Sequence, residues 1–453
     1  MSDNSLHALS PLDGRYATKT KSLNDIFSEY GLIKFRLQVE IDWLLWLHQE
    51  NIISETTLNY EDITFLQNLY LNFSDDVAHA IKKIEQKTNH DVKAIEYFLV
   101  EKLQQRQLNA LIPFLHFACT SEDINNVAYA LMLQRARKHV FLPLLHSLQS
   151  ALHDLAKKTA TRAMLSRTHG QPATPTTLGK EIANTLYRLQ RQIEQFKQQP
   201  LLAKFNGAVG NYNAHLSAFP KIKWPETCER FIDSLGLNFN PYTTQIEPHD
   251  YIAELMHILI RLNTILIDFS RDIWGYISLH YFLLEKISHE VGSSTMPHKI
   301  NPIDFENAEG NLGLANAMAD HLATKLPVSR WQRDLSDSTV MRNIGSIFGY
   351  ALIAYQALIK GIHKLQPNDN KMTADLNAHW EVLGEAIQTV LRANGVMNAY
   401  EQLKTFTRGE NINATIMAKF IDSLTISDEH KQRLHQLTPT NYIGLAAVLA
   451  KEL

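Results

Sequence analysis

The chain has 453 residues, 45% of them hydrophobic, and this length exceeds what one hydrophobic core usually organises. We therefore expect two or three domains, or one long bundle with end pieces. The 47 acidic residues nearly balance the 44 basic ones, and the net charge of −3 excludes a general attraction to nucleic acid or to an anionic membrane. A small anionic substrate could still meet a local basic cluster.

The N-terminal sequence MSDNSLHALSPLDGRY lacks a basic stretch followed by an apolar run. Later apolar stretches are interrupted by charges well before they reach the length of a membrane span. Cys119 and Cys228 have neither CxxC spacing nor neighbouring histidine pairs, so neither a disulfide framework nor a zinc site is indicated. Together these features predict a soluble, cytoplasmic protein.

Helical periodicity dominates the chain, whereas the alternation typical of strands is scarce. The first hundred or so residues are mixed and polar, with short helical patterns such as residues 94–103. Apolar residues spaced three and four apart then predict at least three long helices. After Lys364 the turn-rich sequence LQPNDNK precedes a smaller helical segment. The apolar rows are Leu145, Leu148, Leu152 and Leu155; Leu178, Ile182, Leu186, Leu189, Ile193 and Phe196; and Ile252, Leu255, Leu259, Leu262, Leu266, Phe269, Ile273 and Tyr276.

We accordingly predict an all-α protein of three helical domains. Residues 1–110 would form an N-terminal domain, residues 111–364 a central long-helix bundle and residues 365–453 a C-terminal domain. In the third apolar row, Ile258 and Ile265 lie off the seam, so we expect that helix to be covered on more than one side.

Five segments are rich in small and polar residues that do not favour a helix, and irregular segments between rigid helices often carry chemistry. For each segment alone, loop or cap chemistry is the more common reading. TSED, for example, is a good helix N-terminus with Thr120 or Ser121 as its cap. The segments are TNHDV (88–92), CTSEDIN (119–125), SRTHGQPATP (166–175), TTQIEPHD (243–250) and GSSTMPHKINP (292–302).

The last of these segments, residues 292–302, is the hardest to interpret as a mere linker or a surface lid. Two adjacent hydroxyls follow a glycine, and His298, Lys299 and Asn301 lie between two prolines. Exposed N–H groups and a lysine can neutralise a developing anion. A serine hydrolase is disfavoured because GSSTM does not match GxSxG and the strand–turn–helix setting is absent. GAVG (207–210) is no phosphate loop and HEVGS (289–293) is no zincin motif, which leaves acid–base chemistry by side chains, with no metal and no nucleotide cofactor.

The candidate proton-transfer groups are four histidines and the serines. A lone histidine is more often structural than catalytic, but His169 lies between Arg167, Thr168 and Gly170. In that polar setting an imidazole that changes charge is as plausible as a structural one. The four histidines are His90, His116, His169 and His298.

Three of these segments, TSEDIN, SRTHGQPATP and GSSTMPHKINP, resemble in this order the fumarase/aspartase superfamily, whose signature loop is GSSxMPxKxNP. The resemblance implies three helical domains, a homotetramer around a central bundle of long helices, and cofactor-free elimination of fumarate from a succinyl group. We call residues 292–302 the signature loop. Thr295 and Ile300 depart from the alanine and arginine of many relatives, away from the expected catalytic atoms.

DGRY (13–16), TNHDV, TTQIEPHD and SRWQRDLSDSTVMRN (329–343) are similar to the adenylosuccinate lyase branch, in particular its proteobacterial form. This resemblance implies small anionic nucleotide substrates: adenylosuccinate, cleaved to AMP, and the succinylo-carboxamide ribotide, cleaved to the carboxamide ribotide, each with release of fumarate. The alternatives are another lyase or a 3-carboxymuconate cycloisomerase with the same loop, and an inert structural protein on a lyase fold.

The resemblance also implies a role for each matching residue. Ser293 would be the base and His169 the acid, with Glu306 hydrogen-bonded to that histidine. Asp91 would be structural or would orient His90. The implied active sites are built from three subunits of the tetramer. The implied substrate-binding residues are Thr120, Ser121, Lys299 and Asn301 for the succinyl carboxylates; Gln245 and His90 near the reacting region; Arg15, Tyr16, Arg333, Ser338 and Arg342 for the phosphate and ribose; and, in addition, Asn89 and Asp91.

Overall fold

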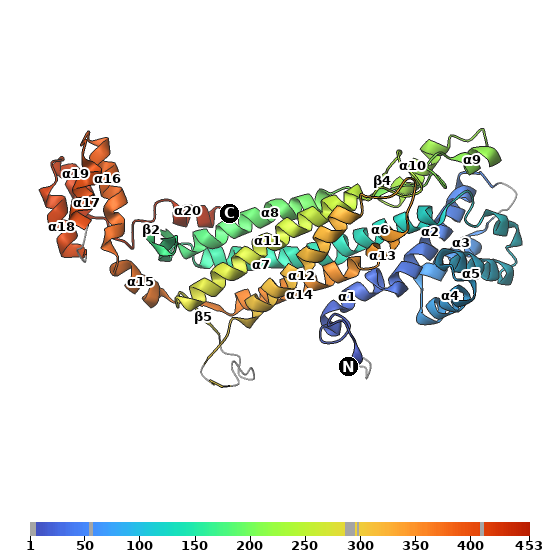
Figure 1. Cartoon of the computed structure of the whole chain (residues 1–453), viewed down its shortest axis with the longest axis horizontal. Helices are drawn as coiled ribbons and strands as arrows, with labels where there is room; N and C mark the ends of the chain where they lie inside the picture. Colours follow the sequence, from blue (N-terminus) through green and yellow to red (C-terminus); the bar gives the residue numbers. More distant parts are fainter. Residues whose placement is uncertain (1–5, 54–57, 286–294, 297–298, 408–411) are drawn as a thin grey trace. The chain divides into compact units, whose positions relative to one another are not determined.

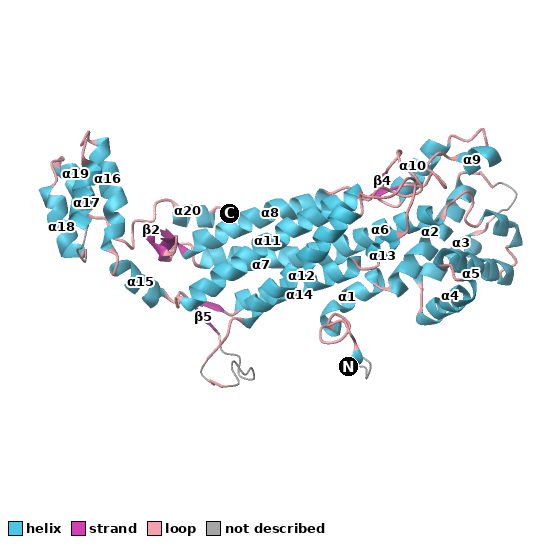
Figure 2. Cartoon of the chain, viewed as in Figure 1, coloured by secondary structure: helices cyan, strands magenta, loops and turns pink. Residues whose placement is uncertain are grey.

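Helices dominate the computed structural model, which describes residues 6–53, 58–285, 295–296, 299–407 and 412–453 (Figures 1 and 2). The predicted all-α class is confirmed, because the described strands form only three two-stranded pairs. The chain divides into two compact units whose boundaries fall within long helices. The three-domain division stays a prediction. Unit 1 comprises Met1–Leu145, Gln192–Asn263 and Asn311–Ala354, and unit 2 comprises His146–Arg191, Thr264–Gly310 and Tyr355–Leu453.

The helices and strands are numbered in chain order. The helices are α1 (Ala17–Phe27), α2 (Glu29–Gln49), α3 (Tyr60–Leu71), α4 (Asp75–Thr88), α5 (Asp91–Gln105), α6 (Ser121–Ala136), α7 (Leu142–Lys158), α8 (Leu178–Gln198), α9 (Asn213–Ala218), α10 (Trp224–Ser234), α11 (Asp250–Ser278), α12 (Ile303–Lys325), α13 (Ser336–Met341), α14 (Ile344–His363), α15 (Asp369–Asn377), α16 (Gly384–Ala393), α17 (Ala399–Thr407), α18 (Ala414–Ser423), α19 (Asp428–His435) and α20 (Ala446–Lys451). The strands are β1 (Ala163–Thr168), β2 (Gln171–Thr177), β3 (Leu202–Ala203), β4 (Asn238–Phe239), β5 (Phe282–Leu284) and β6 (Leu365–Pro367).

The core of unit 1 is built around α2, whose apolar residues occupy more than one face. Ser28 caps this helix by accepting a hydrogen bond from the N–H of Gly31 at 3.2 Å. Trp43 is fully buried, and its ring centroid lies 4.5 Å from that of Phe205. The Trp43 indole N–H donates to the carbonyl of Phe117 at 3.1 Å, so this large side chain is buried with its polar atom satisfied.

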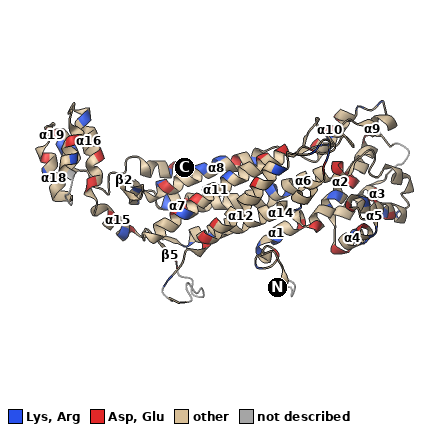
Figure 3. Ribbon diagram, in the orientation of Figure 1, with Lys and Arg blue, Asp and Glu red and all other residues tan. Residues whose placement is uncertain are grey.

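The apolar row predicted on α11 is buried over nearly its whole length. From Ile252 to Ile273 each member of the row is at most 2% exposed. Ile258 and Ile265, which lie off the row, are 6% and 7% exposed, so the expectation that this helix is covered on more than one side is confirmed. Lys and Arg residues are interspersed with Asp and Glu on the helices of both units (Figure 3).

In unit 2, β1 and β2 form an antiparallel hairpin from a segment that was expected to avoid a helix. Thr168 pairs with Gln171, so His169 and Gly170 form its two-residue turn, with φ of +53° and +76°. Two positive φ values suit the twist of a tight hairpin, and the glycine adopts one of them at no steric cost. The hairpin packs on the C-terminal part of the unit through Leu165, Leu376 and Val382.

One stretch among the described residues, Ser336–His363, is long and apolar enough to cross a membrane by length and composition alone. It comprises α13 and α14, and an 18-residue window within it has a moderate mean hydropathy of 1.2. Because 67% of this window is buried inside the protein, the stretch has the character of a core helix.

We predict that Asp42→Asn stabilises the protein increasingly as the pH rises. Burial raises the pKa of Asp42 from 3.8 to about 6, although Tyr70 and Gln38 donate hydrogen bonds to it at 3.0 and 3.3 Å. A folded-state pKa above the unfolded one contributes stability at low pH that is lost as the pH rises through about 6. The neutral amide avoids this loss, so the free energy of unfolding should gain on the order of 1–3 kcal/mol at pH 8 and clearly less at pH 4.5.

Denaturant unfolding at the two pH values measures this difference, and Asp233→Asn, at an exposed aspartate on α10, is the matched control. An equal effect of Asp42→Asn at both pH values would contradict the assignment.

Candidate active site

The segment TNHDV is the turn between α4 and α5 in unit 1. Asn89 ends α4 with a φ of +51°, and His90 is the N-cap of α5. The Nδ1 atom of His90 accepts a hydrogen bond from the N–H of Lys93 at 3.2 Å, so in this geometry the ring proton lies on Nε2. The His90 side chain is 51% exposed, which leaves Nε2 available to a ligand.

Asp91 ties the start of α5 to two arginines. Its carboxylate lies 2.9 Å from the buried guanidinium of Arg36 and 3.1 Å from that of Arg342. Burial raises the pKa of Asp91, but the two guanidinium groups and the N–H of Val92 lower it more, so it lies below its ordinary value. Since these contacts are much shorter than the 3.9 Å to His90, the geometry favours the structural role for Asp91.

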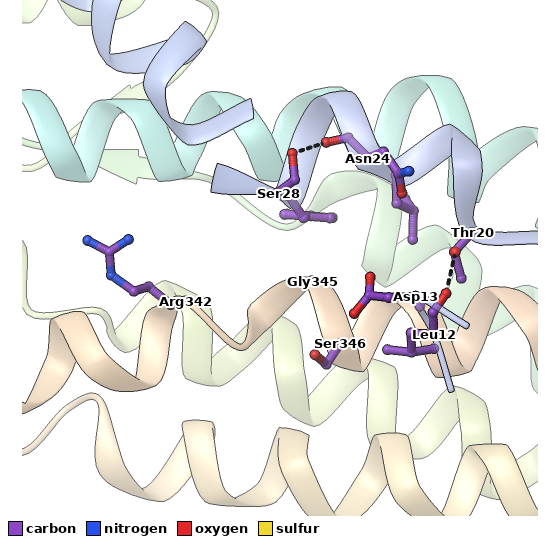
Figure 4. Close-up of a pocket in the computed structure, with 11 residues that line it drawn as sticks. Leu12, Asp13, Thr20, Asn24, Ser28, Arg342, Gly345 and Ser346 are labelled. Atoms are coloured by element: carbon purple, nitrogen blue, oxygen red, sulfur yellow. Dashed lines mark hydrogen bonds between the residues drawn. The ribbon is translucent and has the colours of Figure 1, made fainter. Parts of the chain in front are cut away.

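Arg342 lies at the rim of a small polar pocket between α1 and α14 (Figure 4). The pocket has a volume of about 130 Å³, and Asp13 and Ser346 line it from facing elements. Arg342 also binds Glu29 at 2.6 Å. The DGRY segment leads into α1 beside this pocket; Arg15 is exposed, with its guanidinium 6.0 Å from the ring of Tyr16.

The N-terminus of α6 carries the next two candidates, Thr120 and Ser121. Thr120 is the N-cap, as one reading of TSED predicted, and its N–H donates to Asp123 at 2.8 Å. Asp123 also accepts from the N–H groups of Asn206 and Gly207 at 3.1 and 3.3 Å. These bonds fix the first turn of α6 on the loop that follows β3.

A fully buried ion pair anchors the same turn. The Nζ atom of Lys204 lies 3.0 Å from Asp123, and both side chains are 0% exposed. Lys204 also donates to the carbonyl of Gly207 at 2.8 Å, so both charges keep good partners. The sequence does not reveal Lys204 as part of this site, because a single lysine 81 positions after its partner has no local pattern that marks it.

Gln245, Arg333 and Ser338 lie around this helix start. The backbone N–H of Gln245 donates to the carbonyl of Gln332 at 3.3 Å, and its side chain donates to Ala208 at 3.2 Å. Arg333 binds Glu122 at 2.6 Å. Unit 1 therefore brings together candidates from three segments that are far apart in the sequence.

In unit 2, His169 occupies the exposed tip of the hairpin. In the described part of the chain, its side chain makes no hydrogen bond or ion pair. The hairpin itself is held firmly, since Arg162 binds Asp369 and Arg167 lies 3.7 Å from Asp375. The scaffold thus fixes the backbone of His169 and leaves its imidazole accessible.

The signature loop connects β5 to α12. Ser293 and His298 lie outside the described residues. Lys299 is exposed and Asn301 is half-buried. The pairing of β5 with β6 holds the start of this connection, and Lys364 binds Asp304 at 2.9 Å just after its end.

Glu306 lies in the first turn of α12 and is exposed. Its Oε1 accepts a hydrogen bond from the indole N–H of Trp274 at 3.3 Å. Within one chain this contact takes the place of the expected bond to His169, and the His169–Glu306 pairing stays a prediction.

Comparisons with known proteins show the family to which the chain belongs. The family described as Lyase matches residues 14–318, and the one described as Adenylosuccinate lyase C-terminal matches residues 329–443. The adenylosuccinate lyase of Escherichia coli (strain K12) is 56% identical over 451 residues, with 99% of each chain covered. That of Haemophilus influenzae is 55% identical over 450 residues, also with 99% of each covered. The chain belongs to the adenylosuccinate lyase family.

Membership of this family confirms the resemblance that the sequence segments carried, and with it the assignment as a lyase. A solved structure, the 3-carboxy-cis,cis-muconate lactonizing enzyme from Pseudomonas putida, matches with a TM-score of 0.73 over 95% of this chain and 96% of that one. At 22% identity this likeness shows the fold alone. It confirms the predicted fold class.

We predict that Lys204→Met strongly destabilises the protein. The substitution keeps the length of the side chain but leaves the Asp123 carboxylate buried without its cation, which typically costs about 3–5 kcal/mol of unfolding free energy. Denaturant unfolding measures the loss. Lys197→Met is the control, because Lys197 and its partner Glu194 are both more than half exposed and 3.9 Å apart; removing such a pair costs less than about 1 kcal/mol. Equal losses in the two variants would show that the buried pair does not anchor α6.

Proposed function

We propose that this protein cleaves adenylosuccinate to fumarate and AMP, and the succinylo-carboxamide ribotide to fumarate and the carboxamide ribotide. The observation that carries this proposal is the end-to-end likeness to the adenylosuccinate lyase of E. coli, 56% identical over 451 residues. The likeness includes every segment from which the candidate residues come. We further propose that the enzyme is soluble and cytoplasmic and needs no cofactor.

The proposed elimination requires a base for the carbon next to a carboxylate and an acid for the departing nitrogen. We assign the base to Ser293 and the acid to His169, with Glu306 orienting His169. A serine hydroxyl is a poor base unless its anion is stabilised. In this proposal the N–H groups of the signature loop and Lys299 stabilise that anion. The exposed tip position of His169 supports its assignment, since an acid must reach the substrate.

The substrate carries two carboxylates and a phosphate, and unit 1 supplies donors for them. Thr120 and Ser121, with Lys299 and Asn301 from unit 2, would hold the succinyl carboxylates, with Gln245 and His90 near the reacting atoms. Arginines already held by carboxylates are oriented before the substrate arrives, so less side-chain entropy is lost on binding. The groups proposed for the phosphate and ribose are Arg15, Tyr16, Arg333, Ser338 and Arg342.

We propose that the protein is a homotetramer whose active sites combine residues from different subunits. Two features of the single chain support this. Among the described residues, Glu306 accepts a hydrogen bond from Trp274 and has none with His169, which agrees with a pairing between two copies of the chain. The long helices also carry large apolar side chains that the single chain leaves open: Tyr187, Trp274 and Leu314 are 55%, 51% and 52% exposed.

The substrate assignment is tested by incubating the purified protein with adenylosuccinate and measuring the release of fumarate. Turnover at a few per second or faster, typical of metabolic enzymes, is expected. Absence of turnover together with conversion of 3-carboxymuconate would favour the cycloisomerase alternative. Absence of activity on both substrates would favour an inert structural protein.

The roles of the acid and base are tested by His169→Ala and Ser293→Ala. Each variant should lose about 10²- to 10⁴-fold in kcat, because a positioned acid or base contributes that much, while substrate still binds in calorimetry. His153→Ala, at a histidine beside an exposed aspartate on α7, is the control and should keep wild-type kcat. Near-normal kcat in either test variant would refute the role assigned to that residue.

Shared active sites are tested by mixing the same two inactive variants and allowing their subunits to exchange. If His169 and Ser293 of one site come from different subunits, some mixed tetramers contain intact sites, and part of the wild-type activity returns. If both residues of a site belong to one chain, the mixture stays inactive.

A further inference from the structure

Unit 1 contains a buried cluster of five charged or titratable side chains beside the residues proposed to bind substrate. Four of them are nearly inaccessible: Glu122 is 4% exposed, Glu247 1%, His249 3% and Asp337 5%. The fifth is Arg333, whose side chain is 18% exposed and contacts Glu122. Such groups are stable in a protein interior only when their charges compensate one another.

His249 lies at the centre of this cluster. Its Nε2 is 3.6 Å from Asp337 and its Nδ1 is 3.7 Å from Glu247. Arg333 in turn lies 2.6 Å from Glu122 and 3.7 Å from Asp337. Asp337 therefore faces both cationic groups, and a change at His249 reaches Arg333 through this one carboxylate.

The cluster members are sequence neighbours of the candidate substrate-binding residues. Glu122 follows Ser121, Asp337 precedes Ser338, and His249 comes four residues after Gln245. The cluster joins three segments of unit 1 that carry groups proposed to bind substrate. It is well placed to set their geometry.

The backbone of His249 is also unusual. Its φ of +66° is rare for a residue with a side chain, and such strain persists only where the surroundings enforce it. The N–H of His249 donates to Glu247 at 2.7 Å, and its carbonyl accepts from Ile252 and Ala253 at the start of α11. These bonds hold the imidazole between the two carboxylates.

A metal ion is the first alternative, because Glu122, His249 and Asp337 offer ligand atoms within 4.8 Å of one another, in the described part of the chain. However, the guanidinium of Arg333 already lies 2.6 Å from Glu122, and a cation there repels a metal ion. A protonated imidazole fits better. Burial lowers the pKa of His249, but Asp337, Glu247 and Glu122 raise it more, so the pKa is above its ordinary value.

We propose that His249 is a positioning residue for phosphate recognition: its ring holds the Asp337 carboxylate, and Asp337 and Glu122 together hold the Arg333 guanidinium in the orientation that meets the phosphate. This role rests on the proposed function, in which Arg333 binds the substrate phosphate. His249 itself touches no substrate.

The first test compares His249→Gln with wild type in binding and kinetics. Without the charged ring of His249, Asp337 holds the Arg333 guanidinium less firmly in its orientation. KM for adenylosuccinate and the Kd for AMP should therefore rise by about tenfold, while kcat changes less than about threefold. Binding of adenosine, which lacks the phosphate, should not change. A fall in kcat at constant KM, or an equal weakening of AMP and adenosine, would overturn the proposal.

The second test asks whether His249 acts through Arg333. In an Arg333→Ala background, His249→Gln should weaken AMP binding by no further amount, because the link it supports is already absent. The matched control is His215→Gln, at a fully buried histidine of the same unit. It should lower the unfolding temperature, and any effect it has on AMP binding should be the same in both backgrounds. Additive effects of His249→Gln and Arg333→Ala would refute the coupling.

Two further measurements keep the outcome clear. If His249→Gln does not fold, Asp337→Asn breaks the same link from the other side and should give the same AMP-specific loss. Stoichiometric zinc in the wild-type protein that disappears in His249→Gln would overturn the proposal in favour of a metal site. AMP binding is measured without turnover, so it tests the role of His249 independently of the reaction. A wild-type protein that binds AMP but cleaves no adenylosuccinate would contradict the proposed reaction only. The role of His249 would then be judged by the AMP binding of its variants.

Discussion

The buried pair of Asp123 and Lys204 is the constraint on which the candidate site in unit 1 depends. A charge at 0% exposure has lost its hydration, so each group must be held where its partners are. Asp123 meets this requirement by accepting bonds from the start of its own helix and from the 204–207 loop. The same bonds that satisfy the charge fix Thr120 and Ser121 at the end of α6. The stability of this helix start and the placement of the hydroxyls proposed to bind substrate therefore have one physical cause.

The candidate residues of the two units differ in how many charged partners they contact. In unit 1 the candidates are embedded in networks of charges: Arg342 is bound by Glu29 and Asp91, and Arg333 by Glu122. In unit 2 the imidazole of His169 lies at the tip of a hairpin and has no hydrogen-bond partner among the described residues, and the Lys299 side chain is exposed. Rigid anion-binding groups and accessible proton-transfer groups are the two requirements of the proposed elimination.

Sequence patterns predicted the regular parts of the fold well, because burial on one face of a helix repeats every three or four residues. The row from Ile252 to Ile273 and the cap at Thr120 are local features, and both are confirmed. The hairpin at His169 was expected only as a segment that avoids a helix, since its short strands contain prolines and threonines instead of alternating apolar residues. Lys204 could not be identified, because its partner Asp123 lies far away in the sequence. His249 belongs to the segment TTQIEPHD, but its contact with the distant Asp337 exists only after folding. The composition of the signature loop drew attention to it, whereas the roles of its residues came from their resemblance to a family.

The fold does not determine the substrate, since a lactonizing enzyme with 22% identity shares it with a TM-score of 0.73. Discrimination must come from groups placed on the fold, and the bound arginines of unit 1 offer a physical basis for it. An arginine that already has a carboxylate partner gives up part of that interaction to bind a new anion. A phosphate carrying nearly two charges compensates for this loss, whereas a neutral or weakly charged group does not. Carboxylates such as Glu29 and Glu122 thus orient the arginines. They also compete with the ligand for these arginines, so only a strongly charged ligand binds well.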